Sequence, residues 1–406
     1  MPQGLVVLLL ATLLGIQPVI TDLYLPALPA LTAGFSASMA QAQLTLSALL
    51  LAFGCSQLIW GPLSDRFGRR PVLLVGLVMN VAASIGATVA GSMDMLIAWR
   101  VVQGVAMGAV VVCARATVRD LYAPAEGAHV MSKGLSGLGV LACISAPLGG
   151  LLAEFFGWRY ALLALAVFGS AALALVALRF REPLLHKNPA ALQPETLLGV
   201  WRAVLANPAF LSYSALSAAS YGGLFTFLAT SSFVFIQVLG LSNAAYGGWM
   251  FLNSLAYILG TFLCRRWLAR WGVQKTVALA AFLSLTGGTA MGVLAYIGYS
   301  NVWAIMVPQA LFMLGHGVHQ PCSQSGAIGP FPKAAGAASA LNGFFMMVVA
   351  FGIGMYLGTH MNGTVKPLAY GVWFWSAAIG LVAWTLVRRY GGQAHVIKPS
   401  AVQAVQ

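Results

Sequence analysis

The chain has 406 residues, of which 60% are apolar and only 7% are charged. A soluble domain carries about 25% charged residues, so this composition excludes a cytosolic enzyme or a nucleic-acid-binding protein. The net charge of +13 does not indicate a nucleic-acid partner either, because the basic residues lie in short clusters between long apolar runs. That pattern is typical of a polytopic membrane protein.

The apolar runs predict twelve membrane-spanning helices, each with the roughly 20 residues that a bilayer requires. The expected spans are 5–27, 40–60, 71–91, 95–118, 132–153 and 159–180, then 207–237, 245–264, 274–297, 302–324, 335–358 and 367–387. We therefore expect an all-α polytopic membrane protein with 12 transmembrane helices in two pseudo-symmetric six-helix bundles. The predicted parts are the bundles 1–180 and 207–390, a cytoplasmic linker at 181–206 and a cytoplasmic tail at 391–406.

The basic residues predict the orientation of these spans. Of the 21 Lys and Arg, 18 flank the side on which the N-terminus lies, two (Arg159 and Lys366) flank the other side, and Arg100 falls within a span. Cytoplasmic loops of membrane proteins are enriched in Lys and Arg. Both termini are therefore expected in the cytoplasm.

Several functional classes are disfavoured by what the sequence lacks. The five cysteines lie in or beside apolar runs without metal-binding spacing and are interpreted as small apolar fillers. No metal site, cofactor site or catalytic pairing is apparent, so an enzyme is not expected. A membrane sensor or scaffold stays a remote alternative, because the longest polar stretch is only about 26 residues.

A weak internal repeat connects the two predicted bundles. Arg66-Phe67-Gly68 follows the second span, and Arg270-Trp271-Gly272 follows the eighth, 204 residues later. Such repeats are typical of secondary transporters, whose binding site lies between the two halves.

The segment 61–71 is the strongest single motif. It combines Asp65 with Arg66, Arg69 and Arg70, and it contains Gly61 and Gly68, which permit a tight turn. Asp65 can form charge-assisted bonds across helix ends, so we expect a loop that latches the cytoplasmic side shut. The alternative is that the arginines only set the orientation.

The motif G-x-L-x-D-R-x-G-R-[RK] resembles that of the major facilitator superfamily. The segment 21–29 (TDLYLPALP), with 116–122 and 329–336, is similar to the Bcr/CflA drug-resistance branch. The resemblance implies the major facilitator fold and efflux of drugs or metabolites across the bacterial inner membrane in exchange for protons. It also implies small-molecule, proton and lipid-bilayer partners, no nucleic acid, a monomer, and the proton gradient in place of a cofactor.

Asp22 is the best candidate for proton coupling, with Tyr24 beside it. A carboxylate inside a membrane is costly unless it is paired or protonated, and it marks a functional site by default. The alternative is that the span ends early and Asp22 lies in water. Leu14 occupies a position where some members of the branch carry a second acid.

Arg100 and Gln103 lie in a segment that resembles the family pattern L-x-x-x-R-x-x-Q-G. Arg100 stays protonated at any accessible pH, so it requires a partner inside the protein unless it reaches the membrane surface. We expect Arg100 to tune Asp22.

Four further positions are candidates for gating. Arg119 and Asp120 lie at the cytoplasmic end of the fourth span. In the fifth span, Pro147 and Gly150 belong to a partial match to the antiporter pattern G-P-x-x-G-G, for which ordinary close packing of small residues is the alternative.

The second half contains no acidic residue after Glu195. Its titratable candidates are His316 and His319, which share a helix face and are expected to line a cavity or to bond neighbouring helices. Tyr221 and Phe225 are expected to line an apolar cavity with Phe227, Phe233 and Phe235.

The function predicted from sequence is proton-coupled efflux of amphipathic drugs or similar molecules by alternating access. A dedicated exporter of a nucleobase, amino acid or sugar is the alternative within the same fold.

Overall fold

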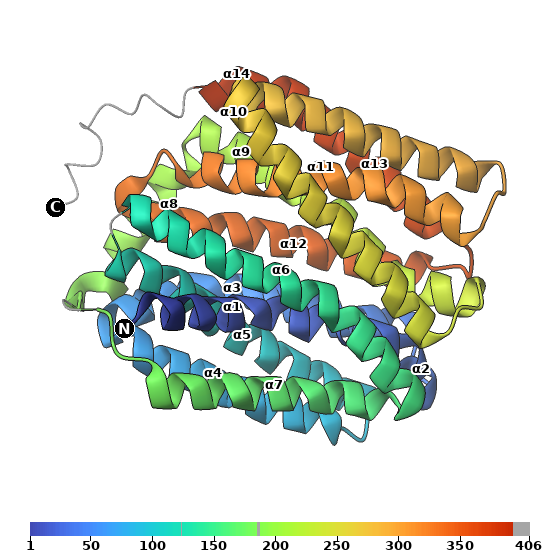
Figure 1. Cartoon of the computed structure of the whole chain (residues 1–406), viewed down its shortest axis with the longest axis horizontal. Helices are drawn as coiled ribbons and strands as arrows, with labels where there is room; N and C mark the ends of the chain where they lie inside the picture. Colours follow the sequence, from blue (N-terminus) through green and yellow to red (C-terminus); the bar gives the residue numbers. More distant parts are fainter. Residues whose placement is uncertain (123, 185–186, 393–406) are drawn as a thin grey trace. The chain divides into compact units, whose positions relative to one another are not determined.

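In the computed structural model, residues 1–122, 124–184 and 187–392 are described, and all regular elements in this part of the chain are helical (Figure 1). The elements up to residue 192 are α1 (Gln3–Asp22), η1 (Leu25–Ala27), α2 (Leu28–Gly34), α3 (Met39–Phe67), α4 (Arg69–Thr88), α5 (Met93–Leu121), α6 (Pro124–Phe155), α7 (Trp158–Arg179) and η2 (Pro189–Leu192). The later elements are α8 (Pro194–Leu205), α9 (Pro208–Ser232), η3 (Phe233–Val238), α10 (Asn243–Tyr296), α11 (Val302–Ile328), η4 (Pro332–Ala334), α12 (Ala335–His360), α13 (Lys366–Val382), η5 (Ala383–Val387) and α14 (Arg388–Tyr390).

Within the described residues, eleven helical segments are long and apolar enough to cross a membrane. One of them, α10, has 54 residues and bends at Gly272, whose backbone is not helical (φ 71°, ψ 176°). A helix of that length extends about 80 Å, whereas the hydrocarbon core of a bilayer is about 30 Å thick. The two arms of α10, which Figure 1 shows meeting at a bend, are therefore two crossings, and the predicted count of twelve is confirmed.

The first span is interrupted where the sequence places its prolines. α1 ends at Asp22, and the chain continues through η1 into α2, so that the apolar segment extends from Gln3 to Gly34. Pro26 has no N–H to donate to the carbonyl of Asp22, and Pro29 has none for Leu25. The prediction of one helix over 5–27 was therefore wrong in detail, because Asp22 lies at a break inside the span.

The predicted loop 61–71 is also mostly helical. α3 continues to Phe67 and α4 begins at Arg69, so the turn consists of Gly68 alone. Gly68 has φ 107°, a value that favours glycine, and its N–H donates to the carbonyl of Ser64 at 3.1 Å. Gly61 lies within α3, and a Cβ built on it would meet no atom of the described residues within 4 Å. The glycine needed for the turn is therefore Gly68, and the prediction that Gly61 contributes to the turn was wrong.

The predicted linker 181–206 contains regular structure where it is described. A short turn of helix, η2, precedes α8, which begins with Pro194 and carries Glu195 in its first turn and Arg202 in its last. A proline and an acid at the start and a base at the end are each favourable for a helix.

By packing, the chain divides into two units. The first unit contains Met1–Ala191, Ser232–Leu252 and Gly354–Met361, and the second contains the remaining residues. These units differ from the predicted bundles 1–180 and 207–390, because two segments from the second half of the chain, Ser232–Leu252 and Gly354–Met361, pack with the first unit.

In the first unit the helices pair as α3 with α5, α1 with α6, and α4 with both α5 and α7. Figure 1 shows α4 and α7 side by side. Small residues lie at these contacts: a Cβ on Gly104 would overlap the carbonyl oxygen of Leu49, and one on Gly108 would overlap Ser56. Close approach of backbones at small residues drives helix packing in membranes.

We expect Gly104→Ala to destabilise the protein by about 1–3 kcal/mol, because the added methyl group forces α3 and α5 apart. The apparent melting temperature of purified protein in detergent measures this effect. Gly352→Ala is the matched control, since Gly352 also lies in a helix but has no atom within 4 Å of its would-be Cβ. Equal melting temperatures for the two variants would contradict the close contact at Gly104.

Candidate functional site

A guanidinium group without exposure to solvent lies at the centre of the first unit. Arg100 on α5 is 0% exposed, and each of its three side-chain nitrogens donates a hydrogen bond. The acceptors are the carbonyls of Thr45 (3.3 Å) and Ile20 (3.2 Å) and Oε1 of Gln103 (2.9 Å). The same guanidinium lies over the Tyr24 ring, 4.2 Å from its centroid. Arg100 is therefore held inside the bundle, and the alternative that it reaches the membrane surface is wrong.

The partners of Arg100 are bonded to further helices. The Tyr24 hydroxyl donates to Oγ1 of Thr45 (2.9 Å), and Nε2 of Gln103 donates to Oγ of Ser84 (2.8 Å). We call Tyr24, Thr45, Ser84, Arg100 and Gln103 the Arg100 network. It connects α3, α4 and α5 to the segment that follows α1. Thr45 and Ser84 were not predicted, because isolated hydroxyl residues in apolar runs give no signal in a single sequence.

Asp22 lies next to this network without joining it. Its carboxylate is half-buried at the last residue of α1 and accepts a hydrogen bond from the Thr21 hydroxyl (2.8 Å). Among the described residues, no Lys, Arg or His is within ion-pair distance of it. Arg100 instead holds the chain on either side of Asp22, at the carbonyl of Ile20 and the ring of Tyr24. In this structure Arg100 thus acts on the backbone around Asp22, and it does not pair with the carboxylate.

The small residues of α6 lie where other segments of the first unit approach most closely. A Cβ on Gly149 would overlap the backbone of Leu23, and one on Gly150 would overlap the carbonyl of Asn243 at the start of α10. Gly247 of α10 in turn faces the backbone of Ala146 and Pro147. The Glu154 carboxylate accepts a 2.7 Å hydrogen bond from the N–H of Ala244. Pro147 and Gly150 therefore lie in a close helix contact, as the packing alternative expected.

A second ionic group lies at the turn between α3 and α4. Arg69 is only 2% exposed, and its nitrogens contact Oδ1 of Asp65 (2.6 Å), Oδ2 of Asp120 (2.7 Å) and Oγ of Ser64 (2.6 Å). Arg119 lies at a longer distance from both acids, 3.9 Å from Asp65 and 3.8 Å from Asp120. The sequence predicted these residues, but the structure makes Arg69 the centre of the group and Asp65 one of its two acids.

Glu182 completes this group and was not predicted. Its carboxylate accepts hydrogen bonds from the N–H groups of Arg69 (2.9 Å) and Arg70 (2.8 Å), 113 and 112 residues away, and thus caps α4. We call Ser64, Asp65, Arg69, Asp120 and Glu182 the Arg69 cluster. All of these residues belong to the first unit. The only signal in the sequence was an acid directly after a predicted span.

The remaining predicted arginines of this turn lie at its edge. The guanidinium of Arg66 is 5.6 Å from the centroid of the Phe67 ring, and Arg70 donates to the carbonyl of Ala177 at 3.0 Å. Arg70 therefore connects the start of α4 to the end of α7.

In the second unit, both predicted histidines are buried on α11. Nδ1 of His316 lies 2.8 Å from the hydroxyl of Ser220 on α9, and Nε2 of His319 lies 3.4 Å from the carbonyl of Val277 on α10. His316 also lies against the rings of Tyr257 and Phe312. Both histidines thus bond neighbouring helices, which is the second of the two roles considered from the sequence.

Around these histidines the second unit holds buried polar atoms without a hydrogen-bond partner. Within the described part, they include Nδ1 of His319, both side-chain polar atoms of Gln309 and Nε2 of Gln320. Ser217 accepts from Ser323 (3.1 Å) and from Asn342 (3.5 Å) nearby. Buried polar groups without partners are costly, so this region is suited to a ligand or water that supplies the missing bonds.

The predicted aromatic residues of α9 are buried as well. The rings of Tyr221 and Phe225 stack with centroids 6.5 Å apart and an interplanar angle of 15°. Phe227 is buried on the same helix, whereas Phe233 and Phe235 fall in the segment that packs with the first unit. The structure therefore divides the predicted aromatic set between the two units.

Comparison with known proteins shows where this architecture occurs. The chain is 32% identical over 338 residues to multidrug resistance protein D of Escherichia coli strain K12, an alignment that covers 83% of this chain and 84% of that protein. It is 26% identical over 365 residues to a bicyclomycin resistance protein homolog of Haemophilus influenzae, covering 90% and 91% of the two chains. A solved xylose transporter from Escherichia coli in a partially occluded inward-open conformation has the same fold, with a TM-score of 0.74 at 12% identity and coverage of 96% and 99%.

A family model also matches most of the chain, since residues 10–355 fit the Major Facilitator Superfamily. Together with twelve apolar crossings and the motif at the α3–α4 turn, it shows that this chain is a multi-pass membrane protein that belongs to the Major Facilitator Superfamily, in the Bcr/CflA drug-resistance branch.

Proposed function

We propose that this protein exports amphipathic drugs or similar small molecules across the bacterial inner membrane, and that protons entering through it drive the export. The drug-resistance names of its relatives support the substrate class. The observation that carries the proton coupling is the half-buried Asp22, which has no cationic partner among the described residues and lies at a break in the first span.

The surroundings of Asp22 support this role in two ways. The Arg100 network fixes the chain at Ile20 and Tyr24, so the carboxylate is held in place although Arg100 does not neutralise it. A carboxylate in this situation must bind a proton or another cation when it is closed off from water, because an unpaired charge in the membrane is costly. Asp22 can thus bind either a proton or a cationic or hydrogen-bonding substrate, and that competition is the basis of exchange.

The second unit supplies candidate contacts for the substrate. Tyr221 and Phe225 offer an apolar stack, and the polar atoms around His316 and His319 offer hydrogen bonds. The buried atoms without partners favour, as a second candidate, a dedicated exporter of a hydrogen-bonding metabolite such as a nucleobase, amino acid or sugar. Transport assays with a panel of apolar cations and polar metabolites distinguish the two, because only the dedicated exporter would reject most apolar cations.

The Arg69 cluster is proposed to gate the cytoplasmic side. It joins α3, α4, α5 and the segment after α7 through charge-assisted bonds, which are stronger than neutral ones. The close contact of α6 with the start of α10, at Pro147 and Gly150, is proposed to move with the alternation of access.

Asp22→Asn is expected to abolish accumulation of substrate driven by a pH difference, while leaving downhill exchange in place, because the amide cannot carry a proton. Transport into proteoliposomes with purified protein measures both activities. Asp94→Asn is the matched control, since Asp94 is an exposed carboxylate in the first turn of α5. Uphill accumulation by Asp22→Asn would place the coupling site elsewhere, and His316 and His319 would be examined next.

Asp120→Asn is expected to slow transport more than Asp65→Asn, with substrate affinity nearly unchanged in both variants. The reason is burial: the Asp120 side chain is 11% exposed and that of Asp65 is 41% exposed, and removing one partner of a buried ion pair costs more than removing an exposed one. Rates in proteoliposomes and binding of labelled substrate are compared with the exposed Glu126→Gln as control. A fall in affinity that parallels the fall in rate would show that the cluster contacts the substrate.

The proposed orientation places both termini and the segment 181–206 in the cytoplasm. Single cysteines at Ser36 and Gln193, both exposed, are introduced into a variant without Cys55, because Cys55 is exposed and the other four cysteines are buried. In intact cells, an impermeant thiol reagent should label position 36 and leave position 193 unlabelled until the membrane is opened. The reverse pattern would invert the topology and the direction of transport.

A further inference from the structure

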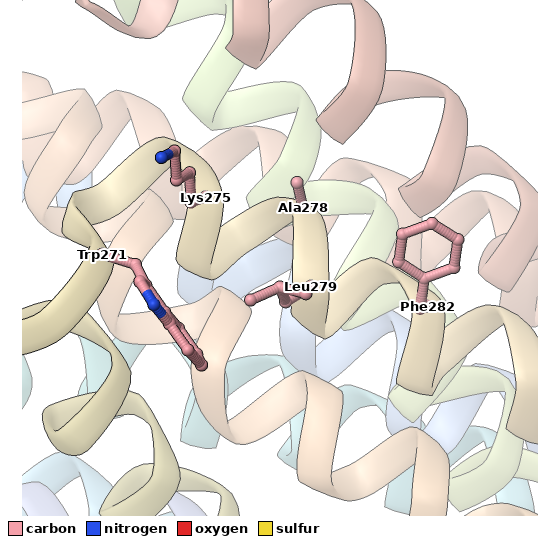
Figure 2. Close-up of a pocket in the computed structure, with 5 residues that line it drawn as sticks. All are labelled: Trp271, Lys275, Ala278, Leu279 and Phe282. Carbon is pink, nitrogen blue, oxygen red and sulfur yellow. The ribbon is translucent and has the colours of Figure 1, made fainter.

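The bend of α10 carries a hollow that no part of the proposed transport path uses. Trp271, Lys275, Ala278, Leu279 and Phe282 line it, with a volume of about 340 Å³ (Figure 2). Four of these five residues are apolar, and Figure 2 shows Leu279 pointing toward the Trp271 ring with Phe282 further along the helix. We call this hollow the α10 pocket.

The pocket is held in place by the end of the last span. Nε1 of Trp384 on η5 donates to the carbonyl of Ala278 (3.1 Å), and its ring lies against Phe282 with centroids 4.7 Å apart. The outer side is open, because Trp271 is 37% exposed and Phe282 is 57% exposed. An open apolar hollow with tryptophans at a helix end is typical of the interface between the membrane and water.

The cations around this pocket have no counter-ion within the described part of the protein. All of them are exposed. Arg265, Arg266 and Arg270 lie before the bend of α10, Lys275 lies just after it, and Arg388 and Arg389 lie on α14. All ion pairs of the described residues belong to Arg69 and Arg119. The sequence explains the imbalance, because it contains no Asp or Glu after Glu195.

The two repeated turns, at Gly68 and at Gly272, differ in the carboxylates that surround them. Gly68 and Gly272 both have positive φ, and the preceding arginine lies over the neighbouring ring in each case, at 5.6 Å for Arg66 and 5.4 Å for Arg270. At the first turn, however, Asp65 and Asp120 form ion pairs with Arg69. A third carboxylate, Glu182, accepts the backbone N–H groups of Arg69 and Arg70 and lies against Gly68.

At the second turn the corresponding space is open. A Cβ on Gly272 would have no atom within 4 Å, whereas one on Gly68 would meet the carboxylate of Glu182. As far as the structure describes the chain, the same backbone turn thus has an internal anion in the first half and none in the second. Within the described residues, no carboxylate pairs with the cations at the second turn.

We propose that the α10 pocket binds an anionic phospholipid. One acyl chain lies in the hollow between Trp271, Leu279 and Phe282, and Arg270 and Lys275 hold the phosphate. A free anion would use the cations but not the hollow, and a neutral lipid would use the hollow but not the cations. An anionic lipid matches both features, and basic pockets at the membrane surface are known to select such headgroups.

The test is lipid binding to the purified full-length protein in detergent, followed by native mass spectrometry. Phosphatidylglycerol and phosphatidylethanolamine with identical acyl chains are titrated separately. We expect phosphatidylglycerol to bind more tightly, and Arg270→Gln and Lys275→Gln each to weaken that binding about fivefold, since one cation near a membrane surface contributes about 1 kcal/mol. Binding of phosphatidylethanolamine, whose ammonium group offsets the charge of its phosphate, is expected to weaken less.

Three controls make the result specific. Lys275→Arg should retain binding, because it keeps the charge. Trp271→Ala should weaken binding although it keeps every cation, because it removes one wall of the hollow. Arg159→Gln should have no effect, although Arg159 also lies over a ring, that of Trp158, at 4.2 Å.

Two outcomes would overturn the proposal. The first is equal binding of the two lipids, which would reduce the pocket to ordinary membrane-facing surface. The second is displacement of phosphatidylglycerol by millimolar inorganic phosphate, with no effect of Trp271→Ala, which would assign the cations to a soluble anion.

Discussion

The structure of the first unit depends on the burial of one permanent charge. Arg100 is removed from solvent and cannot lose its proton, so the chain must supply partners for its donors. Ile20 lies in the last turn of α1, where carbonyls have no helical partner, and its oxygen is available to Arg100. The break in the first span is therefore what allows the guanidinium to be buried. The same break leaves Asp22 at the end of α1, next to the Arg100 network, and no cation of the described residues pairs with its carboxylate.

Acidic and basic residues are distributed differently in the two halves of the chain. All eight acids lie within the first 195 residues, and three of them belong to the Arg69 cluster around a buried arginine. The second half repeats the turn but has no acid near it, and its cations remain exposed around an apolar hollow.

The sequence predicted the elements that depend on local pattern. The twelve spans follow from hydropathy, and the turn at Gly68 follows from the glycine in the motif 61–71. The sequence could not predict contacts between segments that lie far apart. Glu182 caps a helix 112 residues upstream, and the acceptors of Arg100 include two backbone carbonyls that have no residue signature. The extent of α3 was also missed, because glycine and proline at positions 61 and 62 favour a loop locally, whereas the helix continues to Phe67.

The central claim is that a proton and the substrate compete for Asp22. It is tested most directly by adding substrate to purified protein in weakly buffered detergent solution and following the pH with an indicator dye. The account predicts that wild-type protein releases protons when substrate binds and that Asp22→Asn binds substrate without release. Equal proton release from the wild type and from Asp22→Asn would contradict it.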